Sequence, residues 1–425
     1  MMRKRYKRWE KLDNTANLFP VIAGENMSNT YRLAVVLKEP IQKELLQRAL
    51  DEVLPRVPGF RLRLRSGFFW YYLEENDKPA PRVEEEHTYP CRFIHTNQNN
   101  SFLFRVTYYG CRINLEVFHV LADGTGGMAF LRELTYAYLR LAHPDLRDKV
   151  GDGLSDETSL NREDSFLRNY KKASKSMYQS KRAFLIKGEK LAYHGFGIIH
   201  GHISVSAMRR YCKEHGVSIN EYIVAAFTYS TYKAYQRKVS EKRPIRVAVP
   251  VNLRPFFNSI TTKNFFVMVS SEFAPQKDDY TFEEILSITH DCLSSQITRE
   301  NLEAIFSYNV SNEQYLFARA VPLPLKNIAM KLIYTRNALA NTTTITNMGR
   351  ATVAEEYDPY IEGFHCFLSF SKGQGLKCGV ASFHDDLVIS FVTELEDTAV
   401  QMGVFRQMQR DGLDVSIETN GVFYE

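Results

Sequence analysis

The sequence lacks several features that would assign it to a class at once. It has no run of about 18 apolar residues, so no membrane-spanning helix is expected. No apolar stretch of about 7–15 residues follows its first residues, so a secretory signal is not expected. Its 6 cysteines show no C-x-x-C and no regular spacing, which favours free, buried thiols in a reducing cytoplasm.

Two catalytic signatures are also missing. No G-x-S-x-G occurs, so the sequence does not support the nucleophile elbow of an α/β-hydrolase. No G-K-[ST] follows a glycine-rich stretch, which excludes a P-loop. No repeat of about 20–50 residues is visible, so a solenoid is not expected either.

The charge balance gives little indication of a partner. The net charge of +5 is small for 425 residues, and much of it falls in residues 3–8 near the N-terminus. Such an arm can bind nucleic acid or a membrane surface, but a solvated basic tail is the more ordinary interpretation. We therefore expect no nucleic-acid partner.

Strand and helix patterns interleave without a strict βαβ rhythm, which predicts an α/β protein with mixed sheets. Residues 60–73 and 101–120 are expected to form hairpins, and helices are expected at about 127–141 and 166–180. The strands after residue 364 are typical of an antiparallel meander. The polar stretch 143–165 is the best boundary, giving units of residues 1–165 and 166–425.

One stretch, "EVFHVLADGTGGMAF" at 116–130, contains two overlapping motifs. Its G-x-G-x-x-A resembles a dinucleotide fingerprint, which needs an acidic residue after the next strand. The chain instead enters the polar stretch 143–165, and the preceding strand is the return arm of a hairpin. The glycines are therefore better explained as part of a loop than as a phosphate cradle.

The second motif, H-x-x-x-D-G, consists of His119, Asp123 and Gly124. His119 shares strand parity with Ile113, Leu115 and Val117, so its ring is expected to leave the apolar face. A structural core histidine fits that position equally well on this evidence alone. A lone imidazole with one free nitrogen can act as a general base, provided that another group holds the ring.

Metal binding is not expected, because one histidine and one aspartate do not make a tetrahedral set. A second histidine group occurs at His194, His200 and His202, where H-x-H places two imidazoles on one strand face. No carboxylate or cysteine lies close to it in sequence. A zinc site there is the less favoured interpretation.

The stretch "FHVLADGTGG" resembles the H-x-x-x-D-G motif of the chloramphenicol acetyltransferase-like superfamily, which includes condensation domains, BAHD acyltransferases and alcohol acetyltransferases. Three further stretches are similar to family segments in the same order: "VPVNLRPFF" (249–257), "TKNFF" (262–266) and "TTITNMGR" (343–350). The sequence departs from the pattern at Phe118, where condensation domains have another histidine, and at Lys263, which replaces a glycine. The D-F-G-W-G motif of BAHD enzymes is absent.

The resemblance implies two similar α/β lobes that form a V around a central tunnel, with residues 1–165 as the N-terminal lobe and 166–425 as the C-terminal lobe. It implies His119 as the catalytic base, with Asp123 grouped with it. Asp123 is expected to form a buried salt bridge with Arg254 that braces the loop. Gly124 and Asn347 are weaker candidates for oxyanion stabilisation on the acceptor side.

The implied activity is acyl transfer from a thioester to a small-molecule acceptor, with a hydroxyl acceptor preferred over an amine. The resemblance implies no cofactor beyond the thioester co-substrate. We expect acyl-CoA as donor, with an acyl-carrier protein acting in trans as the other possibility. The competing interpretation is a non-catalytic relative that keeps the fold as a binding or scaffold protein.

Overall fold

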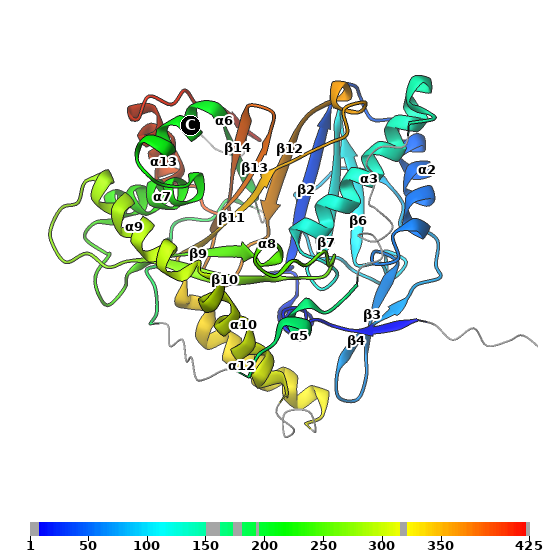
Figure 1. Ribbon diagram of the computed structural model, residues 1–425, viewed down its shortest axis with the longest axis horizontal. Coiled ribbons are helices and arrows are strands. Elements are labelled where there is room, and N and C mark those ends of the chain that lie inside the picture. Colours follow the sequence, from blue (N-terminus) through cyan, green and yellow to red (C-terminus); the bar gives the residue numbers. More distant parts are fainter. Residues whose placement is uncertain (1–7, 150–161, 173–180, 193–194, 315–320, 422–425) are drawn as a thin grey trace, which may run out of the picture.

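The computed structural model describes residues 8–149, 162–172, 181–192, 195–314 and 321–421. Two lobes lie side by side, and each combines a mixed sheet with covering helices (Figure 1). Parallel pairing occurs between β5 and β6 and on both sides of β11, while the other strand pairs are antiparallel. The prediction of an α/β protein with mixed sheets is confirmed. The basic residues 3–7 lie outside the described residues.

The first lobe is built on a sheet of strand order β12-β2-β7-β6-β5, and β6 with β7 is the predicted hairpin. Helices α2 and α3 pack on this sheet and close its apolar core (Figure 1). A small sheet of order β1-β4-β3 contains the other hairpin. The elements are β1 Trp9–Lys11, α1 Phe19–Ile22, β2 Thr30–Leu37, α2 Lys43–Val53, β3 Leu62–Ser66, β4 Tyr71–Glu75, β5 Glu84–Glu85, β6 Phe104–Tyr109, β7 Arg112–Phe118 and α3 Gly124–Ala142.

The second lobe contains a sheet of order β10-β9-β11-β13-β14-β8-β15. Helices α6, α7, α9 and α13 contribute apolar side chains to its core. The elements from residue 165 onward, which include the β12 of the first lobe's sheet, are α5 Ser165–Asn169, β8 Gly197–Ser204, α6 Val205–Glu214, α7 Ile219–Tyr235, β9 Ile245–Asn252, α8 Arg254–Phe257, β10 Phe266–Phe273, α9 Phe282–Gln296, α10 Arg299–Gln314, α12 Leu323–Asn337, β11 Thr343–Arg350, β12 Ile361–Leu368, β13 Leu376–Phe383, β14 Asp386–Thr393, α13 Ala399–Arg410 and β15 Ser416–Thr419.

Strand β12 shows where the expected C-terminal meander is wrong. Of the three strands expected in the meander, only β13 and β14 pair with each other, whereas β12 crosses over and pairs with β2 of the first lobe. Without β12, one edge of the almost fully buried β2 would be left without hydrogen-bond partners. The segment after residue 165 therefore contributes a strand to the first lobe's sheet.

Two predicted helices differ in their bounds. Helix α3 begins three residues before the predicted Gly127, because the Asp123 carboxylate accepts hydrogen bonds from the Thr125 and Gly126 amides at its N-terminus. The helix predicted for 166–180 is only the short α5, and the chain is extended at Tyr170. Residues 173–180 of that prediction lie outside the described residues.

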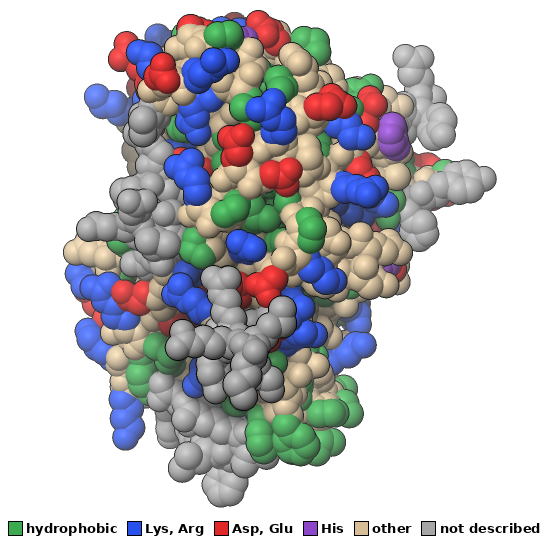
Figure 2. All heavy atoms as spheres, turned by 90° about the vertical axis from the view of Figure 1, so that its right-hand side faces the viewer, with side chains coloured by type: hydrophobic (Ala, Val, Ile, Leu, Met, Phe, Trp, Pro, Cys, Tyr) green, Lys and Arg blue, Asp and Glu red, His purple; other side chains and the backbone are tan. Residues whose placement is uncertain are grey.

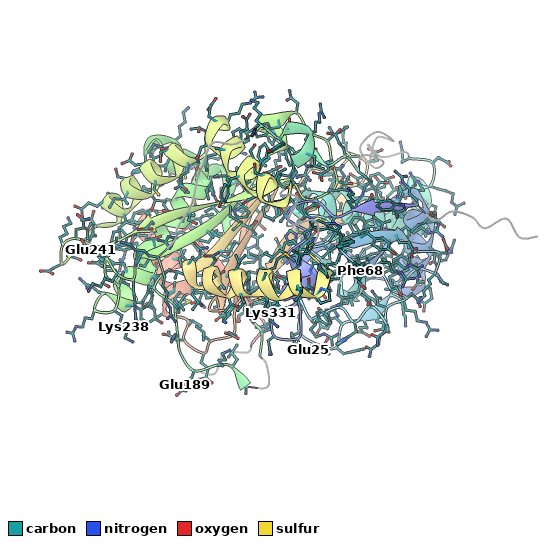
Figure 3. All side chains as sticks on the ribbon, turned by 90° about the horizontal axis from the view of Figure 1, so that it is seen from below. Glu25, Phe68, Glu189, Lys238, Glu241 and Lys331 are labelled. Atoms are coloured by element: carbon teal, nitrogen blue, oxygen red, sulfur yellow. The ribbon has the colours of Figure 1, made fainter. Side chains whose placement is uncertain are left out.

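The surface of the first lobe carries interspersed acidic and basic side chains, with a group of hydrophobic side chains at its lower edge (Figure 2). Seen from below, α12 runs from the second lobe toward the β3–β4 turn at Phe68 (Figure 3). The Leu323 amide donates to the Phe68 carbonyl at 2.9 Å, which ties the two lobes together there. Within the described part of the chain, no helix combines the length and apolar character needed to cross a membrane.

Candidate active site

His119 lies immediately after β7 and lines a cavity between the lobes. Its backbone amide donates to the Asn29 carbonyl at 3.0 Å, which fixes the chain as it leaves the sheet. The ring packs among the aromatic rings of Phe19, Tyr31 and Phe266, with centroid distances of 4.8, 5.0 and 5.5 Å. The imidazole is thus held on three sides and lines the cavity with its remaining surface.

A chain of hydrogen bonds fixes the tautomer of His119. The Asn264 Oδ1 lies 2.9 Å from the ring Nδ1, and the Asn264 Nδ2 donates to the Asp13 carboxylate at 2.9 Å and to the His119 carbonyl at 3.1 Å. A flipped amide would place its oxygen against two acceptors, so the oxygen must face the ring. Nδ1 therefore carries the proton, and Nε2 keeps a free lone pair.

Burial shifts the pKa values of His119 and Asp13, the two titratable groups in this series of hydrogen bonds. Burial lowers the pKa of His119, an effect that the charge of Asp123 and the bond to Asn264 oppose. The ring is therefore neutral at pH 7, as a base must be. Burial raises the pKa of Asp13 to about 6, while its bond from Asn264 acts in the other direction. Asp13 is thus ionised above that pH and accepts from Asn264.

The Asp123 carboxylate forms its hydrogen bonds with groups other than the His119 ring. Its carboxylate forms a bidentate pair with Arg254, at 2.8 Å from Nη1 to Oδ2 and 3.0 Å from Nη2 to Oδ1. It also accepts from the amides of Thr125, Gly126 and Phe265 at 3.1, 3.2 and 3.0 Å. Both side chains are buried, and the pair joins the loop of the first lobe to α8, between β9 and β10 of the second.

The glycines after Asp123 allow two close approaches. A Cβ on Gly126 would stand 2.4 Å from the Thr262 carbonyl oxygen, and one on Gly124 would stand 2.6 Å from the Met348 sulfur. The first of these neighbours is backbone and has little freedom to move. The start of α3 therefore packs directly on the second lobe, which explains the glycines without a bound phosphate.

Asn347 lies on β11 and lines the same cavity as the motif. Its Oδ1 accepts from the Gly349 amide at 2.8 Å, so its Nδ2 is the remaining donor group of the side chain. Asn347, Gly124 and His119 all line the same cavity. The structure thus brings together, around one cavity, the five site residues predicted from the sequence: His119, Asp123, Gly124, Arg254 and Asn347.

The cavity has a volume of about 610 Å³ and takes its walls from both lobes. Apolar side chains line much of it, and a polar group gathers on β11, β13 and the segment between β12 and β13. The polar group comprises Thr344, Thr346, Ser369, Ser371 and Lys377. A space of this size admits a small organic substrate beside His119.

The second histidine group does not form a metal site in the described part of the chain. His200 bonds to Ser390 at 2.9 Å and His202 to Asp386 at 3.0 Å, with ring centroids 6.2 Å apart. His194 lies outside the described residues. Among the residues that the structure describes, no three His, Cys, Asp or Glu side chains are arranged to hold a metal ion.

Sequence reasoning missed the group that orients His119. Asn264 was identified only as part of a matching segment, and Asp13 was not identified at all. Asp13 is 251 residues from Asn264 in the chain and carries no local motif. Lys377 was also missed, although a lysine in the apolar strand "LKCGVASF" is a signal that is visible in the sequence.

No protein-family model matches the sequence, and no curated protein matches it. Solved structures do match. F. sporotrichioides TRI101 complexed with coenzyme A and T-2 matches at 10% identity, with a TM-score of 0.64 over 96% of this chain and 99% of that one. The trichothecene 15-O-acetyltransferase TRI3 from Fusarium sporotrichioides matches at 9% identity, with a TM-score of 0.59 over 95% of this chain and 97% of that one. The first condensation domain of the calcium-dependent antibiotic synthetase matches at 11% identity, with a TM-score of 0.59 over 95% of this chain and 95% of that one.

These matches extend over nearly the whole chain at low identity, so they establish its fold. The chain shares the two-lobed fold of these solved structures, which is the fold that the H-x-x-x-D-G resemblance implies. Because this fold occurs in both acetyltransferases and condensation domains, the chemistry of this protein has to be argued from its own site.

Proposed function

We propose that this protein is an acyltransferase that moves an acyl group from a thioester to a hydroxyl group of a small-molecule acceptor, with an amine as the less favoured nucleophile. The observation that carries the proposal is the hydrogen bond that holds the His119 ring. Its Nδ1 is held by Asn264, and its ring lines a cavity large enough for substrate. An unprotonated Nε2 at that position is suited to general-base catalysis.

The proposed reaction has two steps. The acceptor oxygen attacks the thioester carbon while Nε2 of His119 takes the hydroxyl proton, giving a tetrahedral intermediate. The intermediate then collapses, the carbon–sulfur bond breaks, and the imidazolium returns the proton to the departing sulfur. The products are an ester and a free thiol, and His119 ends neutral as it began.

Two groups are proposed to stabilise the negative oxygen of the intermediate. The backbone amide of Gly124 lies at the N-terminus of α3, where helix amides favour negative charge. Asn347 faces the same cavity, and its amide nitrogen is left as a donor. In this mechanism Asp123 takes no proton, because its oxygens are committed to Arg254 and the backbone.

Acyl-CoA is the proposed donor, with an acyl-carrier protein acting in trans as the alternative. Support comes from the fold shared with TRI101, which was solved with coenzyme A, and from the net charge of +5, which suits an anionic donor. All six cysteines are free, and four of them are buried. Free thiols fit a reducing compartment, so we propose a cytoplasmic location.

The test is release of free thiol from a panel of acyl-CoAs in the presence of alcohols or amines. We expect turnover by the full chain and a fall of at least about 10²-fold for His119→Ala, because the base is lost. His87→Ala is the matched control, since His87 is exposed.

Equal rates for His119→Ala and the unmodified protein would overturn the role of His119. Binding of acyl-CoA without turnover by either protein would instead favour the scaffold interpretation. Comparing alcohols with amines of the same carbon skeleton decides between O- and N-acyl transfer.

A further inference from the structure

Lys377 is a buried lysine in the wall of the cavity that contains His119. It lies on β13 between Leu376 and Cys378, which point into the apolar core of the second lobe. Because side chains alternate along a strand, Lys377 leaves the opposite face, where it lines the cavity. The residue is 7% exposed, so its ammonium group is largely removed from bulk water.

This lysine has no carboxylate partner within the described residues. Its Nζ donates to the Ser371 hydroxyl at 2.6 Å, and no ion pair joins it to a described acidic side chain. Two other buried cationic side chains do have acidic partners. Arg254 pairs with Asp123, and Lys263 lies 3.6 Å from Glu10.

An ammonium group without a counterion is costly to bury. Burial accordingly lowers the pKa of Lys377 to about 8, so that the side chain is still mostly charged at pH 7. A buried charge of this kind is stable in the folded protein only at a cost, which a bound anion would offset.

The surroundings of Lys377 suit a small anion. Ser371 contacts Lys377, while Ser369 and Thr346 line the same cavity, and these three carry hydroxyl groups that can donate hydrogen bonds. The charge of Lys377 also acts on His119, whose pKa it lowers alongside the larger effect of burial. The two side chains therefore share one electrostatic environment, with the base and the cation facing the same space.

We propose that Lys377 binds the carboxylate of a substrate, so that one of the two compounds brought together beside His119 is an organic acid. The carboxylate pairs with the ammonium group and accepts from the neighbouring hydroxyls. That the bound acid is a substrate rests on the proposed function. The binding site itself rests only on Lys377 and its cavity.

Binding is tested first without any turnover. Isothermal titration compares butyrate with butyramide and benzoate with benzamide, pairs in which only the charge of the head group changes substantially. We expect each carboxylate to bind at least about 10-fold more tightly than its amide, and Lys377→Met to abolish that difference. Lys377→Arg should retain part of it, because it keeps the positive charge.

Lys331→Met is the matched control, because Lys331 is an exposed lysine on α12 (Figure 3). Circular dichroism of each variant establishes that it is folded before titration. Equal affinity for carboxylate and amide in the unmodified protein would overturn the inference. A carboxylate preference that survives Lys377→Met would overturn it as well.

Thiol release then identifies which substrate carries the acid. One arm offers acetyl-CoA with hydroxy acids and their amides, and the other offers succinyl-CoA and butyryl-CoA with a neutral alcohol. Lys377→Met should raise KM at least about 10-fold only in the arm whose acid it binds.

The two proposals fail in different ways. Lys377-dependent binding of carboxylates with no thiol release would overturn the proposed function and support the binding site. Thiol release that requires His119 but is indifferent to carboxylates would do the reverse.

Discussion

Substituting Asp123 by asparagine separates a structural brace from a proton relay. The carboxylate accepts five hydrogen bonds, and its Oδ1 and Oδ2 share them between the Arg254 guanidinium and the amides of Thr125, Gly126 and Phe265. Asparagine keeps the shape but replaces one acceptor oxygen with an NH₂ group. In either orientation that group faces donors, so the replaced side of the site loses its bonds.

The size of the effect follows from burial. Arg254 would retain the Thr261 carbonyl at 2.9 Å and the Lys263 carbonyl at 2.7 Å, but it would lose its counterion. Removing one partner of a buried ion pair destabilises a protein by about 3–5 kcal/mol. We therefore expect the free energy of unfolding to fall by about that amount in Asp123→Asn, with Asp148→Asn as an exposed control.

Urea denaturation measures this difference, and a double-mutant cycle with Arg254→Met assigns it to the pair. The double variant should lose less stability than the sum of the two single variants, because neither charge is then left alone. An Asp123→Asn protein of unchanged stability whose thiol release falls at least about 10²-fold would refute the brace and favour a relay.

Three further predictions concern other members of the site. Asn264→Ala frees the Nδ1 of His119 from its acceptor, so kcat for thiol release should fall about 10- to 100-fold, whereas retention of full activity would show that the tautomer is fixed otherwise. Lys377→Met removes a charge whose pKa burial lowers from 10.5 to about 8. At about 1.4 kcal/mol per pKa unit, urea denaturation at pH 7 should show a gain of about 3 kcal/mol. The gain is full below pH 8 and disappears as the pH rises toward 10.5, because the unfolded lysine binds the proton over that range. Finally, for substrates without a carboxylate, kcat/KM should be flat from about pH 6.5 to 8 and fall at lower pH, since burial lowers the pKa of His119 below its usual 6.5 and raises that of Asp13 to about 6. A fall that begins above pH 7 would contradict a neutral His119.

The sequence was most informative where local pattern decides structure. Strand parity placed His119 with the inward side chains of β7, and the two early hairpins followed from alternation and turn residues. The contact of Asp123 with Arg254, 131 residues apart, came instead from the family resemblance. Nothing in the local pattern of either segment required that pairing.

The remaining features depend on contacts between distant segments. The crossing of β12 to β2 reflects a sheet edge that needs a partner, which becomes apparent only once the first sheet is assembled. The role of Asp13 depends on Asn264 turning its oxygen toward His119, and periodicity does not encode that orientation. The burial of Lys377 likewise follows from where β13 lies between the lobes.

The central claim is that His119 removes the acceptor proton during direct acyl transfer. Single-turnover reactions with ¹³C-labelled acetyl-CoA, quenched and followed by mass spectrometry, test it most directly. We expect the label to move to the acceptor with no acyl group on the protein, and His119→Gln to slow transfer at least about 10²-fold. Transfer at an unchanged rate in His119→Gln, or label bound covalently to the protein during turnover, would contradict it.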